Sequence, residues 1–356
     1  MYFSRGLGRG HAVIDIEIAR ALPRLGSDLE VTFVSHATGA DTFRRRGYAV
    51  VDLGLPDHPD PLETLVRSTR LIARLKPTLV IAHETFMALP AAKAFDIRSI
   101  LITHWFVDPN QLWMQCLRYA DRVVFVEEPG IFLEPPWVRG KVDYVGPAVR
   151  PFSWSKSDRA RARRELSIPD NCLVLLVLPG SLPEAAAPIC DTVTHAFDSL
   201  EVPAKRMVWL SGSDYVEISR RLKDHPNVTV LESDPQIDRL MAAGDLAVTK
   251  GTYNTTRELT ALGVPSIAIT WDNFVDDVFA IRNPAVTVLA GKELDRRSFA
   301  NCLRDTVASL PSRRFASPAS GCEGIVGAAE AINRVLVGGD SKDGEPVTPR
   351  PNVGVT

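Results

Sequence analysis

The sequence reads Lys250-Gly251-Thr252-Tyr253-Asn254-Thr255-Thr256-Arg257-Glu258 between an apolar run, Asp245 to Val248, and the end of a helical pattern at Gly263-Val264-Pro265. A strand, a glycine-containing turn and a helix in this order form the repeating unit of α/β folds. The turn places a glycine, hydroxyl groups and a cation at a helix N-terminus, where unpaired N–H groups and the helix dipole attract anions. These residues therefore predict a site for nucleotide phosphates.

A second interpretation of the same residues needs no ligand. Thr255 and Glu258 have the S/T-x-x-E spacing of a capping box, which closes the start of a helix by itself. The local sequence leaves both interpretations open. They are also compatible, because a cap can form within the helix while the loop before it binds phosphate.

Strand-like apolar runs separated by helical patterns continue along the whole chain, which is typical of parallel sheets covered by helices. Their nearly continuous apolar character suits strands that are buried on both faces. We expect a helix over Leu62 to Leu75. The expected strands are Val31 to Ser35, Leu79 to Ala82, Ser99 to Thr103, Arg122 to Val126, Leu173 to Leu178, Arg206 to Leu210, Val228 to Leu231, Leu246 to Val248, Ser266 to Ile269 and Val286 to Leu289.

The run Val145-Gly146-Pro147-Ala148-Val149-Arg150-Pro151 breaks this alternation with a glycine and two prolines, as a linker between domains does. The sequence thus predicts an α/β protein of two Rossmann-like domains facing a cleft. We expect the domains at 1–146 and 152–323, a closing helix at 324–337 and a disordered tail, rich in Gly, Pro, Asp and Lys, at 338–356.

Composition places the chain among ordinary soluble proteins and narrows its partners. Its 356 residues are 45% hydrophobic and 24% charged, with a formal net charge of −2. Because no dense basic block is present, we expect no nucleic-acid partner. The 5 cysteines lack C-x-x-C spacing, which argues against a zinc site and a disulfide framework and fits a reducing cytoplasm.

We expect no transmembrane segment and no signal peptide, since no apolar stretch reaches the roughly 18 residues of a spanning helix. Peripheral contact with a membrane is compatible with this sequence.

Ligands of parallel sheets bind at the carboxyl ends of the strands, so the loops there are the first places to search. Ser4-Arg5-Gly6-Leu7-Gly8-Arg9-Gly10-His11 follows a short apolar start and precedes a helical pattern. It differs from the dinucleotide motif G-x-G-x-x-G because His11 replaces the last glycine, which disfavours a nicotinamide or flavin cofactor. A histidine at a helix entrance has a lowered pKa and suits a general base. The alternative is an ordinary first-turn residue.

Two further positions complete the set. Gly180 and Ser181, directly after an apolar strand, can face a phosphate, or Ser181 can simply cap the next helix. Glu258 lies within one helical turn of the predicted phosphate site, where a carboxylate can accept hydrogen bonds from two ribose hydroxyls.

Together these loops resemble those of GT-B-fold glycosyltransferases, in the branch related to the bacterial N-acetylglucosaminyltransferase of peptidoglycan precursor synthesis, glycosyltransferase family 28. The resemblance spans roughly residues 1 to 335. Its most specific part runs from Ile237 to Pro265. There a short helix, a strand, a phosphate loop and an acidic helix are followed by Ala261-Leu262-Gly263-Val264-Pro265, the family's A-x-G-x-P.

This resemblance implies a catalytic role for His11, which activates the acceptor hydroxyl, and a ribose-binding role for Glu258. The implied phosphate-binding residues are Gly8, Gly10, Gly180, Ser181, Lys250, Gly251, Thr252, Asn254 and Thr255. The segment from Ser233 to Ile237 would lie against the base, with contacts at Asp234, Gln236 and Ile237. For the acceptor we expect loops of the N-terminal domain, including His83, His104 and Trp105.

One family segment is poorly matched. Relatives carry P-x-x-x-x-D-Q-x-x-N-A for the donor sugar, and here Asp276 and Ala280 are the partial matches, in two registers that differ by one residue. Asp272, Asn273 and Asp277 are candidate substitutes, although acidic residues after a strand are commonly just solvated.

The resemblance predicts an inverting transfer of a hexose or N-acetylhexosamine from a nucleotide-diphosphate sugar, UDP-linked, to an acceptor hydroxyl. We expect no bound metal, because the chain has no D-x-D element, and no other cofactor. Two alternatives stay open. One is a nucleotide-sugar epimerase with His83, Glu84 and His104 as acid–base groups, and the other is a non-catalytic nucleotide-sugar-binding protein.

Overall fold

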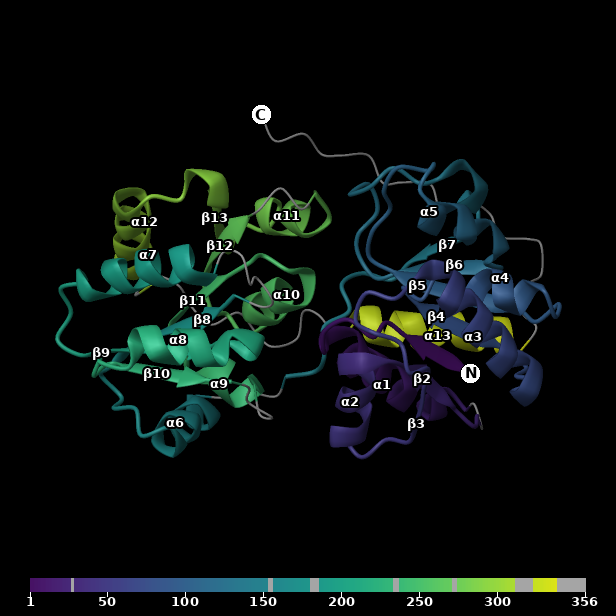
Figure 1. Cartoon of the computed structure of the whole chain (residues 1–356), viewed down its shortest axis with the longest axis horizontal. Coiled ribbons are helices and arrows are strands. Elements are labelled where there is room, and N and C mark those ends of the chain that lie inside the picture. The colour runs from purple at the N-terminus through teal and green to yellow at the C-terminus, as the bar shows by residue number, and fades with distance from the viewer. Residues whose placement is uncertain are drawn as a thin grey trace.

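Two parallel sheets, each covered by helices on both faces, form separate halves of this protein (Figure 1). The computed structural model describes residues 1–26, 29–152, 156–179, 186–232, 237–270, 274–310 and 323–337. The predicted tail at 338–356 lies outside these residues. This is the GT-B arrangement that the sequence predicts.

The N-terminal sheet has 7 strands within the described residues, in the order β3-β2-β1-β4-β5-β6-β7, all parallel. In chain order, β1 to β7 span Tyr2–Ser4, Phe33–Ser35, Val50–Asp52, Val80–His83, Ser99–Thr103, Arg122–Phe125 and Val142–Tyr144. Buried Val, Ile, Leu and Phe side chains fill β1, β2, β4, β5 and β6, since these strands have helices on both sides.

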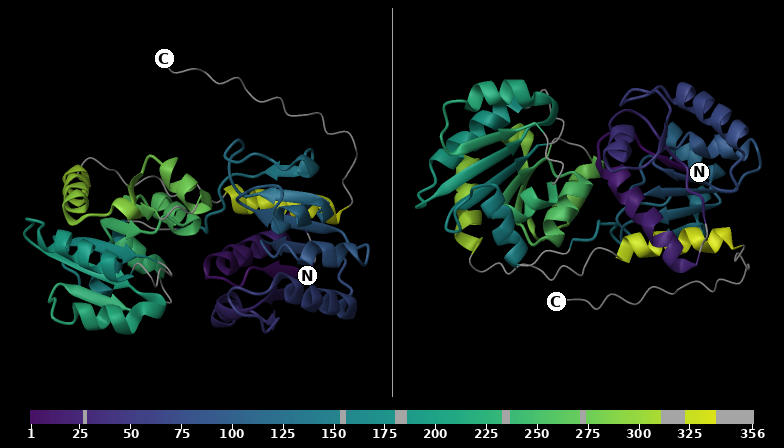
Figure 2. Two further views of the ribbon diagram at one scale, coloured as in Figure 1. Left: turned by 45° about the horizontal axis from the view of Figure 1, so that its top comes forward. Right: turned by 90° about the horizontal axis from the view of Figure 1, so that it is seen from below.

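The helices of this half fall into two groups, one on each face of the sheet. Helices α1 (Gly10–Ala21), α2 (Ala37–Arg45) and α13 (Glu323–Leu336) share one apolar cluster. Helices α3 (Pro61–Leu75), α4 (Ala88–Lys93) and α5 (Leu112–Cys116) share the other. Figure 2 shows α13, in yellow, beside the N-terminal sheet, so the last described helix packs against the N-terminal half.

The C-terminal sheet has 6 described strands in the order β10-β9-β8-β11-β12-β13, again all parallel. From β8 to β13 they span Leu173–Leu178, Lys205–Leu210, Val228–Leu231, Leu246–Thr249, Ser266–Thr270 and Val286–Ala290. One apolar cluster joins α7 (Ala186–Asp198), α8 (Tyr215–Leu222) and α12 (Arg296–Ser309) to the sheet. A second cluster joins it to α9 (Ile237–Ala243) and α10 (Tyr253–Ala261), and α6 (Lys156–Glu165) packs against α9. Helix α11 (Phe274–Ile281) follows β12.

The expected strands all occur, but the sequence did not reveal β3 and β7. Both lie at the edges of the N-terminal sheet, and both are only partly buried, with Asp52 exposed in β3. A strand that is only partly covered can be stable without a continuous apolar run. Its sequence therefore resembles a strand less clearly.

In each sheet the strand order reverses at one place, between β1 and β4 and between β8 and β11. Loops that leave neighbouring strands in opposite directions open a crevice at such a switch point, and ligands bind there. The glycine loop follows β1, and the loop beginning at Lys250 follows β11. Two of the loops selected from the sequence therefore start at the two switch points.

The two halves meet where α10 and α11 approach the end of β6. The Tyr253 hydroxyl donates a hydrogen bond to the Val126 carbonyl at 2.5 Å, and the Arg257 guanidinium pairs with the Glu127 carboxylate. Phe279 on α11 is 1% exposed and belongs to an apolar cluster of the N-terminal half. Of the helices described, none has the length and apolar character to cross a bilayer.

The Arg257–Glu127 pair gives a test of how the halves are joined. Glu127 is fully buried, so Arg257→Ala leaves a buried carboxylate without its partner, at a cost of about 3 kcal/mol. We expect the midpoint of thermal unfolding to fall by roughly 5–10 °C. Calorimetry measures the shift.

The control is Arg221→Ala, which removes two ion pairs on the surface, with Glu217 and Asp191, and should change the midpoint by no more than about 2 °C. Adding Glu127→Gln to Arg257→Ala should recover part of the loss, because the amide carries no charge. Equal shifts for Arg257→Ala and Arg221→Ala would contradict this view of the interface.

Candidate active site

The glycine loop after β1 lies directly against the loop that precedes α10. A Cβ atom on Gly10 would stand 2.0 Å from the side-chain amide nitrogen of Asn254, so any other residue there would displace that side chain. Gly8, with a φ of +73°, holds a backbone conformation that side chains disfavour. Gly10 therefore allows the N-terminal half to approach the predicted phosphate site closely, whereas Gly8 supplies the turn of the loop.

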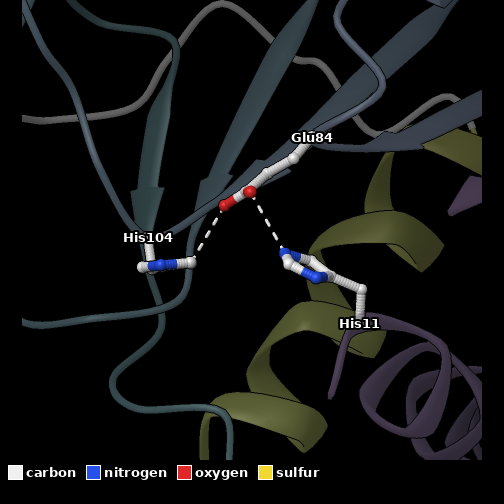
Figure 3. Close-up of side chains that lie close together, drawn as sticks. All are labelled: His11, Glu84 and His104. Carbon is white, nitrogen blue, oxygen red and sulfur yellow. Dashed lines mark hydrogen bonds and ion pairs between the residues drawn. The ribbon is translucent and has the colours of Figure 1, made fainter. Parts of the chain in front are cut away.

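His11 is the second residue of α1 and points to the carboxyl end of β4 (Figure 3). Its Nε2 lies 3.0 Å from Oε2 of Glu84, and its side chain is 11% exposed. Burial lowers the pKa of His11 to about 4, although the nearby Glu84 carboxylate acts in the opposite direction. The direction is the one expected for a helix entrance, but burial is the main cause. At neutral pH the imidazole is therefore uncharged and can accept a proton.

Glu84 is the centre of this group of side chains. Its Oε2 accepts a hydrogen bond from Arg5 at 2.7 Å as well as facing His11, and its Oε1 lies 3.0 Å from Nδ1 of His104 (Figure 3). Burial raises the pKa of the Glu84 carboxyl, but His104 and His11 outweigh it and hold the pKa well below its usual range. Its φ of +51° is a strained backbone conformation for a residue with a side chain.

His83, the residue before Glu84, points to the other side of β4. Its Nδ1 lies 2.6 Å from Oδ1 of Asp15, which also accepts a hydrogen bond from the Tyr2 hydroxyl at 2.8 Å. Burial lowers the pKa of His83, but the charge and hydrogen bond of Asp15 outweigh it, so that the pKa is raised overall. The His83 and His11 rings meet edge to face at 4.7 Å. His83 therefore packs against the His11 ring on one side and contacts Asp15 on the other.

His104 and Trp105, the other residues expected at the acceptor, follow β5. His104 is buried, and its ring stacks on the Tyr253 ring with centroids 4.2 Å apart and an interplanar angle of 12°. Trp105 is half-buried and packs against Phe86 at 5.3 Å between ring centroids. His104 thus belongs to the group around Glu84, whereas Trp105 lies among aromatic side chains beside it.

The loop after β11 leaves the start of α10 uncapped. Gly251 has a φ of +79°, and its N–H donates to the Thr249 hydroxyl at 2.9 Å. Thr252 occupies the N-cap position without a side-chain hydrogen bond to the helix. The amides of the first turn are therefore open to an anion. Lys250, at the end of β11, lies directly before this turn.

The capping box predicted from Thr255 and Glu258 is wrong. Helix α10 begins at Tyr253, so Thr255 lies inside the helix and cannot be its N-cap. The first turn starts earlier because Thr252, with a ψ of 144°, is the last residue outside the helix.

Glu258 is held by an arginine that the sequence did not reveal. Nε of Arg150 lies 2.7 Å from Oε1 of Glu258, and its Nη2 donates to Oε2 at 3.1 Å, while Nη1 contacts Asp238. The Arg150 side chain is 5% exposed. Burial raises the pKa of the Glu258 carboxyl, and the Arg150 charge opposes that rise. Arg150 belongs to the linker. The glycine and prolines around it in the sequence indicate a linker and not a binding site.

For some of the predicted site residues the structure gives only the helix on which they lie, and others are outside the described residues. Ile237 is the first residue of α9, and Asp276 and Asp277 lie on α11. The remaining predicted residues, Gly180, Ser181, Asp234, Gln236, Asp272 and Asn273, lie outside the described part of the chain.

Among the described residues, His11, Glu84 and His104 offer potential metal ligands, with ligand atoms within 4.8 Å of one another. The Arg5 guanidinium, 2.7 Å from Glu84, already neutralises the carboxylate and would repel a divalent cation. This arrangement suits proton transfer between an oriented imidazole and a hydroxyl better than metal binding.

Comparisons with known proteins identify the sequence relatives of this chain. No family model matches it. An N-acetylglucosamine transferase of Desulforudis audaxviator, named for UDP-N-acetylglucosamine and an N-acetylmuramyl-(pentapeptide) pyrophosphoryl-undecaprenol acceptor, is 30% identical over 296 residues. The match covers 73% of this chain and 75% of that protein. A transferase of the same name from Salinibacter ruber is 28% identical over 268 residues, or 73% of this chain and 67% of the relative.

Solved structures with the same fold include transferases and epimerases. The structure of MurG from Acinetobacter baumannii matches 95% of this chain and 97% of its own, with a TM-score of 0.60 and 16% identity. The structure of an assigned UDP-N-acetylglucosamine 2-epimerase from Listeria monocytogenes covers 100% of this chain and 99% of its own, with a TM-score of 0.69 and 14% identity. At such identities the likeness concerns the fold alone, and the sequence relatives favour transfer.

The ionisation of His11 can be measured directly. We expect its ring signals in an NMR titration to move with a midpoint of about 4, because burial disfavours the charged imidazole. Glu84→Gln should lower this midpoint further, since the Glu84 charge raises the pKa of His11. The midpoint of His83 should lie above 6.5, because the charge and hydrogen bond of Asp15 raise its pKa, and it too should fall in Glu84→Gln, since the Glu84 charge also raises the pKa of His83. A His11 midpoint near 6.5, or one that rises in Glu84→Gln, would contradict this geometry.

Proposed function

Because this chain belongs to the family of bacterial N-acetylglucosaminyltransferases of peptidoglycan precursor synthesis, and is a glycosyltransferase, we propose that it transfers N-acetylglucosamine from UDP to a lipid-linked acceptor hydroxyl. The observation that carries this proposal is the contact between Gly10 and Asn254, which joins the His11 loop to the open start of α10. A proton acceptor and a phosphate site then share one cleft.

In this proposal the donor diphosphate lies at the N-terminus of α10. The uncapped amides after Thr252 and the side chains of Asn254 and Thr255 are in position to donate hydrogen bonds. Lys250 offsets the charge that develops on the leaving diphosphate. The predicted contribution of Gly180 and Ser181 from the loop after β8 completes the site.

Glu258 binds the ribose in the same proposal. Each carboxylate oxygen has about two acceptor positions, and Arg150 occupies one position on each oxygen. The remaining positions can accept hydrogen bonds from the two ribose hydroxyls. Arg150 also orients the carboxylate and opposes its protonation, which burial favours. A buried, fixed carboxylate loses little conformational freedom when the donor binds.

The chemical step is a single displacement at the anomeric carbon. The neutral His11 ring donates its Nε2–H to the Glu84 carboxylate, so Nδ1 is the nitrogen that accepts the proton of the acceptor hydroxyl, whose oxygen forms the new bond as the diphosphate leaves. Glu84 orients the imidazole and stabilises its cationic form after proton transfer. Attack from the face opposite the leaving group inverts the anomeric configuration. The step needs no metal in this proposal.

We assign acceptor binding to residues 1–146 and donor binding to residues 152–323. For the acceptor, a polyprenyl-linked sugar of the kind named for the relatives requires access to a membrane surface. We therefore propose that the protein acts in the cytoplasm, in peripheral contact with the membrane. Leu112 and Leu133, 52% and 84% exposed on the acceptor half, support such contact.

Epimerisation is the second candidate. The observation in its favour is the group formed by His11, Glu84 and His104 on a fold shared with epimerases. The relatives at 28–30% identity are transferases, which favours transfer. The two activities differ in their products, because an epimerase leaves the donor intact as its isomer.

The test is an assay of UDP release from UDP-N-acetylglucosamine with and without a short-chain lipid-linked acceptor. We expect acceptor-dependent release that EDTA does not change. His11→Ala should lower kcat about 100-fold or more with little change in donor KM, because it removes the base. Glu258→Ala should raise donor KM about tenfold with a smaller effect on kcat.

The matched control is Glu217→Ala, which removes an exposed carboxylate on α8 and should leave both constants unchanged. Appearance of an isomerised donor would establish epimerisation instead. Full activity of His11→Ala would refute the assignment of the base.

A further inference from the structure

Tyr253 stands between the donor site and the acid–base group. It is the first residue of α10, directly after the N-cap Thr252, and is 4% exposed. Its hydroxyl donates a hydrogen bond across the interface to the Val126 carbonyl at 2.5 Å. Its ring therefore has a fixed place, set by the C-terminal half through the helix and by the N-terminal half through the hydroxyl.

The Tyr253 ring lies flat on His104. The two centroids are 4.2 Å apart, with an interplanar angle of 12°. Phe279, also from the C-terminal half, lies 5.5 Å from the His104 ring and 4.7 Å from the Tyr253 ring. The contacts on these sides of His104 come from the half of the molecule that carries the predicted donor site.

On its other side, His104 meets the buried carboxylate of Glu84. The distance from its Nδ1 to Oε1 is 3.0 Å, while His11 and Arg5 face Oε2. The orientation of the His104 ring decides whether Nδ1 faces Oε1, because rotation of the ring would turn this nitrogen away. A flat aromatic contact opposes such rotation.

From these contacts we infer that Tyr253 is a positioning residue: its ring holds His104 against Glu84 and so couples the donor loop to the base His11. The aromatic ring is the part that acts on His104, whereas the hydroxyl anchors the interface. The catalytic consequence rests on the proposed function, but the orientation of His104 does not.

Two readouts test this inference. The first is the NMR signal of the His104 ring protons, assigned by its loss in His104→Ala. The Tyr253 ring current should shift this signal upfield in the wild type, and Tyr253→Leu should abolish that shift. The second is turnover, for which we expect Tyr253→Leu to lower kcat about 10- to 100-fold with an almost unchanged donor KM.

Two variants separate positioning from packing. Tyr253→Phe keeps the ring and should retain both the upfield shift and most of the activity. Phe132→Leu alters the same aromatic interface, since Phe132 packs on Phe279 at 5.7 Å, and it should leave the His104 signal and kcat close to wild type. If Tyr253→Leu unfolds at a lower temperature than the wild type, Tyr253→Met, which retains apolar volume, is used in its place.

A double-mutant cycle completes the test. If Tyr253 acts through His104, Tyr253→Leu should lower kcat much less in a His104→Ala background than in the wild type. Equal losses in both backgrounds, or an unmoved His104 signal in Tyr253→Leu, would overturn the inference. Absence of transferase activity in the wild type would instead refute the proposed function, and the NMR result would still decide the position of His104.

Discussion

The buried carboxylate of Glu84 organises the group of side chains at the carboxyl end of β4. A fully buried charge is costly unless charged or polar partners surround it, and Glu84 has Arg5, His11 and His104 within 3.0 Å. These partners come from the loops after β1 and β5 and from the start of α1. Folding of the three segments is thereby linked to one side chain, whose own backbone conformation is strained.

A second carboxylate, only 13% exposed, plays a comparable part in the C-terminal half. Glu258 is held by Arg150, which lies in the linker between the halves. The linker therefore contributes directly to the surface on which we place the ribose. Between the two carboxylates lie the contacts of Asn254 with Gly10 and of Tyr253 with His104, both of which join the halves. One continuous set of contacts thus connects the proposed donor site to the proposed base.

Much of this architecture could be predicted from the sequence. Strands buried on both faces have apolar runs long enough to recognise, and loops directly after them were identified by their glycines and polar residues. The positions of Lys250 and His11 in loops at the carboxyl ends of strands follow from that reasoning, whereas the switch points themselves depend on the strand order, which only the structure gives. The edge strands Val50–Asp52 and Val142–Tyr144 could not be predicted in this way, because their burial is incomplete.

The charge pairs of the site could not be predicted in the same way. Glu84 and His11 are 73 residues apart, and Arg150 and Glu258 are 108 residues apart, so no local pattern connects them. From the sequence, Glu84 was a candidate only as an acid–base group in the alternative function, a nucleotide-sugar epimerase. The misplaced cap at Thr255 has another cause, since several hydroxyl residues in a row allow more than one start for the helix.

In the proposed mechanism, Glu84 orients and stabilises His11 as the base of glycosyl transfer. The most direct test is the kcat of Glu84→Gln with saturating donor and acceptor, since glutamine keeps the shape of the side chain and removes its charge. We expect a fall in kcat of about 100-fold with an unchanged donor KM. A kcat equal to that of the wild type would contradict it.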